Sequence, residues 1–142
     1  MPLWAYRHGA GWLLGRTFIY FIHVGRSSGR RYDTVAMVLR DDPATREVVV
    51  CAAWGPGTDW YRNLQAGPAG TVQIGHDRYL PQQRFLTDAE AFDVAAAFGR
   101  AHPHLLHLMQ SVLGWGDLDQ DDPLRDFVAG HPMLAFSHQR TA

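Results

Sequence analysis

The pattern of apolar and polar positions predicts a succession of short strands. Val, Ile, Thr and aromatic residues gather in short runs bounded by Gly, Pro or Asp, which is typical of strands. The predicted strands are Thr17–Val24, Arg31–Arg40, Glu47–Ala53, Thr71–Gly75, Arg78–Leu86 and Met133–Phe136. Pro81 has no backbone N–H, so the strand that contains it is expected to lie at an edge or to carry a bulge.

Helices are predicted where apolar residues recur every three or four positions. A short helix is predicted to begin at a cap of Thr58 or Asp59, to run to Leu64 and to be stopped by Gly67-Pro68. Another helix is predicted to begin at a capping box, Thr87 to Glu90, and to break at His102-Pro103. Further helices are expected at Pro2–Leu14, His104–Leu113 and Pro123–Val128. The predicted fold is mainly β (α+β): a small barrel with an N-terminal helix and a helical insertion after the fifth strand.

Length and charge narrow the class of protein. The 142 residues suggest one domain, 1–142, and the net charge of −1 provides no field that would attract nucleic acid. A single cysteine, Cys51, excludes an internal disulfide; it is expected to be a buried residue of a strand, in a chain suited to a reducing cytoplasm.

Two motifs carry candidate chemistry. The first, Val24–Arg31, is a glycine-bounded turn with three guanidinium groups and two hydroxyls. Such a turn suits a phosphate or a carboxylate. The second joins Trp54-Gly55-Pro56-Gly57 to the segment Asp59–Leu64, and it adds flat aromatic surface and an amide. An anion cradle together with an aromatic, amide-bearing wall is what a phosphorylated cofactor with a ring system requires.

These motifs resemble those of the deazaflavin-dependent nitroreductase family. Its members carry Gly-Arg-Lys/Arg-Ser-Gly before a strand and Trp-Tyr-x-Asn-Leu after it, and this chain has Gly25–Gly29 and Trp60–Leu64 in the same order. The resemblance runs from about Thr17 to Gly75 and implies a split β-barrel of the FMN-binding type. It also implies an oxidoreductase that transfers hydride from reduced coenzyme F-420 (8-hydroxy-5-deazaflavin) to an enone, quinone or nitroaromatic. The chain departs from the family where Ser27 replaces the usual basic residue.

The resemblance also implies the residues that bind the cofactor. Arg26 and Arg30 would pair with phosphate or tail carboxylate oxygens, while Ser27, Ser28 and the Gly29 N–H complete the cradle. The loop at Trp54 and Gly55 would approach the ring. The remaining candidates are Trp60, Arg62 and Asn63. No residue stands out as the proton donor; Tyr6, Tyr20 and a bound water are candidates.

Other interpretations remain open. The chain could be a non-catalytic carrier of a lipid or fatty acid, enclosed by the apolar N-terminus and the stripe within 105–113, or an FMN-dependent reductase. The trio His102, His104 and His107 lacks a further ligand, so no metal site is expected. The apolar N-terminal segment allows a peripheral membrane contact, although we favour its covering the barrel or an oligomer interface. Split-barrel proteins often form homodimers, which the exposed aromatic residues here would suit.

Overall fold

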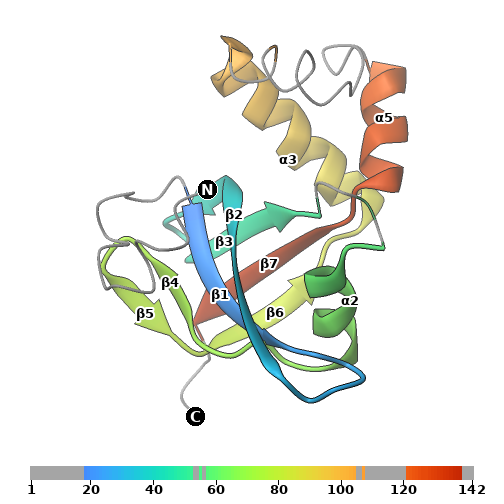
Figure 1. Cartoon of the computed structure of the whole chain (residues 1–142). Helices are drawn as coiled ribbons and strands as arrows, with labels where there is room; N and C mark the ends of the chain where they lie inside the picture. Colours follow the sequence, from blue (N-terminus) through green and yellow to red (C-terminus); the bar gives the residue numbers. More distant parts are fainter. Residues whose placement is uncertain (1–17, 53–54, 56, 105–106, 108–120, 139–142) are drawn as a thin grey trace.

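A computed structural model describes residues 18–52, 55, 57–104, 107 and 121–138. Their main element is a seven-stranded antiparallel sheet with the order β5-β4-β1-β2-β3-β7-β6. The strands are β1 (Phe18–Val24), β2 (Arg31–Asp42), β3 (Glu47–Cys51), β4 (Val72–Ile74), β5 (Asp77–Tyr79), β6 (Pro81–Phe85) and β7 (Met133–His138). The sheet curls into a nearly closed barrel, which confirms the predicted split β-barrel (Figure 1).

Strand β2 belongs to both halves of the barrel. Its first part pairs with β1, from Arg31 opposite Val24 to Met37 opposite Phe18. Its last part pairs with β3, after a register shift between Val38 and Arg40. Such a bulge bends a strand and increases its twist. One long strand can therefore serve two sheet halves that face in different directions.

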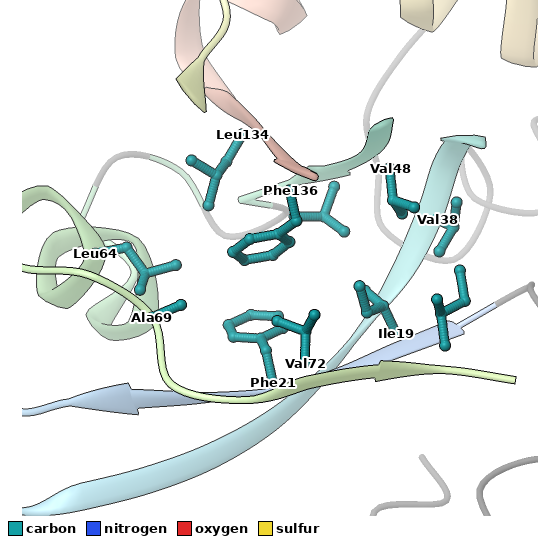
Figure 2. Packing of buried hydrophobic residues seen from close by; sticks show 11 residues of the cluster. Ile19, Phe21, Val38, Val48, Leu64, Ala69, Val72, Leu134 and Phe136 are labelled. Atoms are coloured by element: carbon teal, nitrogen blue, oxygen red, sulfur yellow. The ribbon is translucent and has the colours of Figure 1, made fainter. Parts of the chain in front are cut away.

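Strands β3 and β7 separate two hydrophobic cores. Their side chains inside the barrel are those of Val48, Val50, Leu134 and Phe136. Their opposite faces contribute Val49, Met133 and Ala135 to a second core beneath the helices. Within the barrel the rings of Phe21 and Phe136 pack against each other, with centroids 5.3 Å apart and planes tilted by 48° (Figure 2). Burial on both faces explains why these strands are continuous apolar runs in the sequence.

The described helices are α2 (Asp59–Ala66), α3 (Asp88–Ala101) and α5 (Asp121–Gly130). Helices α3 and α5 lie together against the outer side of the sheet, far from the β1–β2 turn, whereas α2 lies beside the barrel (Figure 1). The predicted capping box is present in full, since Thr87 accepts from the Glu90 N–H and the Glu90 side chain returns to the Thr87 backbone. Helix α3 ends before His102, as predicted.

The structure corrects several of the sequence-based boundaries. The predicted strand Arg78–Leu86 is two strands, because the chain changes partners at Leu80 from β4 to β7. The helical insertion therefore follows the sixth strand rather than the fifth. Strand β6 is an edge strand that begins at Pro81, as its missing N–H predicted. Strand β2 extends beyond its predicted end at Arg40 and includes Asp41 and Asp42, because its pairing with β3 continues through Asp42.

The predicted helix Pro2–Leu14 lies outside the described residues, as does most of the predicted helix His104–Leu113. In the part of the chain that the structure describes, no helix is both long and apolar enough to cross a membrane.

Candidate functional site

The turn between β1 and β2 is closed by its own backbone. The Gly25 N–H donates to Arg30 O at 2.8 Å, and the Gly29 N–H donates to Gly25 O at 2.9 Å. Gly29 has a φ of 70°, in the left-handed region that favours glycine. A Cβ at Gly25 would lie 2.6 Å from Ser28 Oγ. The backbone of the turn therefore favours glycine at position 29, whereas a side chain at position 25 would require the Ser28 hydroxyl to move.

Helix α2 carries the second motif. Thr58 precedes its first turn, but the Thr58 hydroxyl donates to Gly55 O at 2.7 Å instead of capping the helix. This bond fixes the approach of the loop to the helix. The side chains that α2 buries against the barrel are Tyr61, Asn63 and Leu64. Asn63 is the polar member of this face, so its amide must find partners inside the protein.

The far end of α2 is fixed by an edge strand. The Gln83 amide of β6 donates to Leu64 O at 2.7 Å and to Gly67 O at 3.2 Å. Its oxygen accepts from the Ala69 N–H at 2.8 Å. These bonds satisfy carbonyls that the end of a helix leaves without partners.

The two sequence motifs meet through Arg26 and Asn63. Asn63 Oδ1 accepts two hydrogen bonds from Arg26, one from the backbone N–H at 3.1 Å and one from guanidinium Nη1 at 2.8 Å. Arg26 Nη2 also lies 3.4 Å from Asp59 Oδ1, but the Asp59 side chain is 85% exposed, so solvent screens this pair strongly. The structure thus brings together two segments separated by 37 residues.

A buried histidine completes this arrangement. Asn63 Nδ2 lies 2.9 Å from His23 Nδ1, and only 6% of His23 and 5% of Asn63 are exposed. Desolvation lowers the pKa of His23 below its ordinary value of 6.5, and the nearby Asp33 and Asp59 offset this only in part. His23 is therefore neutral at physiological pH.

A cavity of about 610 Å³ opens between the turn and α2. Its lining residues are His23, Gly25, Arg26, Ser27, Ser28, Tyr32, Asp33, Thr34, Thr58, Asp59, Trp60 and Asn63. Aromatic surface flanks it, since Tyr32 stacks on His23 with centroids 5.8 Å apart, and Trp60 meets Phe21 edge-on at 5.2 Å. The volume and the mixture of rings with a few polar groups are those of a small-molecule site.

The predicted site residues divide into two groups. Arg26, Ser27, Ser28, Trp60 and Asn63 line this cavity. The others that the structure describes, Gly29, Arg30, Gly55 and Arg62, do not line it, and Trp54 lies outside the described residues. The Gly29 N–H, expected in the anion cradle, is engaged within the turn. Arg26 is therefore the one arginine among the lining residues.

The candidate proton donor Tyr20 lies elsewhere. Its hydroxyl donates to Asp33 Oδ2 at 3.1 Å, and Tyr20 and Asp33 share the sheet face of Ile22, because Asp33 lies opposite Ile22 in the register. His23 and its partner Tyr32 occupy the other face. Asp33 itself is among the residues that line the cavity, so Tyr20 contacts a lining residue without lining the cavity. The other candidate, Tyr6, lies outside the described residues.

A larger cavity of about 960 Å³ lies along β3, β6 and β7, away from both motifs. It has two arginines, Arg46 and Arg84. Arg84 is paired with two carboxylates, since Nη1 contacts Glu90 at 2.8 Å and Nη2 contacts Glu47 at 2.9 Å, and Arg46 Nη2 lies 3.9 Å from Asp77. The hydrogen bonds that Arg84 donates to Glu47 and Glu90 raise its pKa. Both arginines have carboxylate partners within the protein, so size alone does not make this cavity the better site.

Neither a metal centre nor a reactive thiol is found among the described residues. No group of three or more His, Cys, Asp and Glu side chains in this part of the chain could hold a metal ion. Cys51 ends β3 and is only partly covered, whereas the sequence predicted a buried residue. Desolvation raises the pKa of its thiol to about 12, so it stays protonated at neutral pH.

Sequence reasoning missed His23 and Tyr32 as site residues. A signal for His23 was present, since it continues the alternation of Ile19 and Phe21, whose side chains point into the barrel. A polar residue at an inward position, two residues before Gly25-Arg26, indicates a site rather than a core.

Comparison with known proteins identifies the fold but not the family. No protein-family model and no curated protein matches the chain. An F420-H2 dependent reductase (FDR-A) superposes with a TM-score of 0.55 at 18% identity, over 87% of this chain and 96% of that one. A structure described as a domain-swapped dimer superposes with a TM-score of 0.55 at 16% identity, over 96% of this chain and 100% of that one. Campylobacter jejuni ChuZ superposes with a TM-score of 0.52 at 10% identity, over 95% of this chain and 53% of the ChuZ chain. At such identities the likeness shows a shared fold alone.

Proposed function

We propose that this chain is an oxidoreductase that uses reduced coenzyme F-420 to reduce an electron-poor acceptor such as an enone, a quinone or a nitroaromatic. One observation carries the proposal: Arg26 and Asn63, from the two motifs that resemble the deazaflavin-dependent family, are hydrogen-bonded at the edge of one cavity. The name of the F420-H2 dependent reductase among the structural neighbours agrees with it.

The residues around the cavity fit the polar and the flat parts of such a cofactor. Arg26 presents a guanidinium that Asn63 orients, and Ser27 and Ser28 line the same cavity, so a phosphate or carboxylate can be bound here. Tyr32 and Trp60 offer apolar ring surface. When bound, the deazaflavin supplies the hydride, and the protein supplies position and the exclusion of water.

Arg30 and Arg62 have a different part in the proposal. Both are exposed and lie outside the cavity lining, where they can attract the remaining charges of an extended, polyanionic tail. With Ser27 in place of a basic residue, the site offers one guanidinium at close range. This observation favours a second candidate, FMN, whose single phosphate requires fewer cations than the tail of F-420.

Titration of the purified protein with oxidised F-420 and with FMN, followed by fluorescence, tests the proposal. We expect a submicromolar dissociation constant for F-420, and oxidation of reduced F-420 when menadione is added. Tighter binding of FMN than of F-420 would identify FMN, the second candidate, as the cofactor. Binding of neither, together with a fatty acid found by native mass spectrometry, would identify a carrier.

The assembly is proposed separately. The fold neighbour described as a domain-swapped dimer supports a homodimer. Light scattering coupled to size-exclusion chromatography should then give about twice the mass of 16.0 kDa.

A further inference from the structure

His23 is held in one orientation by groups from three elements. It lies on β1, follows the inward-facing Ile19 and Phe21, and stacks on Tyr32 of β2 with an interplanar angle of 25°. Asn63 of α2 approaches its Nδ1 at 2.9 Å. The ring is thus fixed both in plane and in rotation, which a residue that only fills space does not require.

The partners of Asn63 determine which nitrogen of His23 carries the proton. Asn63 Oδ1 accepts from two N–H groups of Arg26, so this end of the amide must be the oxygen. The other end is then the NH₂ group, which donates to His23 Nδ1. A neutral imidazole that accepts at Nδ1 carries its hydrogen at Nε2. The Arg26–Asn63 pair therefore sets the tautomer of His23.

The Nε2–H group has no protein partner among the described residues. In the described part of the chain, the side-chain hydrogen bond of His23 is the one between its Nδ1 and Asn63. Among the described residues, Arg40 Nε is a fully buried polar atom without a hydrogen-bond partner. His23 Nε2 is not such an atom. Because the ring lines the cavity, this donor is accessible from it. The charged groups nearby are Arg26 of the turn, Asp33 of β2 and Asp59 of α2.

We propose that His23 is a ligand-binding residue whose Nε2–H donates to an anionic oxygen, of a phosphate or a carboxylate, that Arg26 also binds. The identity of the ligand as the tail of F-420 rests on the proposed function, whereas the preset tautomer does not. Asn63 is then a positioning residue: it orients the Arg26 guanidinium and the His23 ring rather than contacting the ligand. This assignment adds an uncharged donor to a site that lacks the second cation of the family motif.

Two substitutions separate the donor from the contact with Asn63. In His23→Asn the side-chain amide reaches about as far as Nδ1, so it can keep the contact with Asn63 but presents no donor at the place of Nε2. In His23→Gln the amide reaches the place of Nε2. We expect H23N to weaken F-420 binding at least about tenfold and H23Q to restore most of it, because a hydrogen bond to a charged group is lost and regained.

Experiments with other ligands show whether the loss of affinity in H23N concerns the anionic tail of F-420. A deazaflavin without phosphate and glutamates should bind wild type and H23N equally. Competition by inorganic phosphate and by glutarate then shows whether the oxygen belongs to a phosphate or a carboxylate. Equal F-420 affinity of H23N and wild type would overturn the inference, as would equal losses for the tailless compound.

Nuclear magnetic resonance of the ligand-free protein tests the tautomer independently of F-420. We expect the imidazole ¹⁵N pattern of an Nε2–H tautomer for His23, changed to a mixture in Asn63→Leu. An Nδ1–H tautomer in the wild type would overturn the inference. If wild type binds no F-420, the proposed function fails, and inorganic phosphate becomes the probe. A phosphate-dependent shift of His23 Nε2 would then support the inference, and its absence would overturn it.

Discussion

Arg26 and Arg84 are both held by side chains, but the partners differ in charge. Arg84 makes four hydrogen bonds to the carboxylates of Glu47 and Glu90, at 2.8 to 3.2 Å. Arg26 is held at close range by the neutral amide of Asn63, and its carboxylate neighbour Asp59 is 85% exposed. A guanidinium that an amide orients keeps its charge for a ligand, whereas one between two carboxylates serves the fold. The larger cavity beside Arg84 is thus less informative than the smaller one beside Arg26.

The sharpest test of this comparison is the pair Arg26→Ala and Arg84→Ala. Removal of Arg26 deletes the charged donor of the site and should weaken F-420 binding about 100-fold, the effect of losing strong charge-assisted hydrogen bonds. Arg84→Ala is the matched control, since it also removes one guanidinium, and it should leave the dissociation constant unchanged. Fluorescence titration measures both. Equal losses of affinity in the two variants would contradict the comparison.

Asn63→Ala should lower stability as well as affinity. The change leaves the Arg26 backbone N–H and the buried His23 Nδ1 without their partner, at a cost of about 2 kcal/mol in the free energy of unfolding. F-420 binding should weaken about tenfold, because the guanidinium loses its orientation while its charge remains. Urea denaturation gives the first value and titration the second. A variant with normal stability and normal affinity would show that Asn63 positions nothing.

Arg84→Ala should have the opposite signature, a loss of stability without a loss of binding. Its ion pairs link β6 to β3 and to the start of α3, but the side chain is 46% exposed, so screening limits the loss to about 1 kcal/mol. Arg84→Lys, which cannot reproduce the two-pronged geometry, should recover part of it. Denaturation in low and high salt is the measurement, and a loss that does not depend on salt would point to packing instead.

The smallest effect is a pH dependence from His23. Because its folded pKa lies below the ordinary value of 6.5, the unfolded chain takes up a proton at a higher pH than the folded protein does. The free energy of unfolding should therefore fall as the pH drops below about 6.5, and His23 should contribute no slope above it. The stability difference between wild type and His23→Gln, measured by denaturation from pH 8 to pH 5, isolates this contribution. A difference that stays constant over the range would show that folding does not lower the pKa of His23.

The sequence was most informative where local patterns decide the structure. Alternation and β-branched runs located β1, β2, β3 and β7, and the Thr87–Glu90 box located the start of α3. The change of partner at Leu80 could not be read, because it depends on barrel closure, which brings consecutive strands to opposite edges of the sheet. The length of β2 was underestimated for a similar reason, since pairing with β3 overrides the turn preference of Asp41 and Asp42.

The candidate site was predictable in its parts but not in its connections. The turn and helix motifs named Arg26, Ser27, Ser28, Trp60 and Asn63, all of which line one cavity. No local signal indicates that Asn63 would hold Arg26, because the two residues are brought together by the fold. Nor does a local signal distinguish Arg30 from Arg26, although both belong to the same motif and only Arg26 lines the cavity.

The three hydrogen bonds of Gln83 tie the end of α2 to an edge strand. Edge strands are among the first parts of a sheet to open in local fluctuations, since one side of their ladder is free. Helix α2 and β6 should therefore exchange their amide hydrogens as one cooperative unit. Access to the cavity beneath α2 would then be governed by the fraying of a strand that contributes no residue to it.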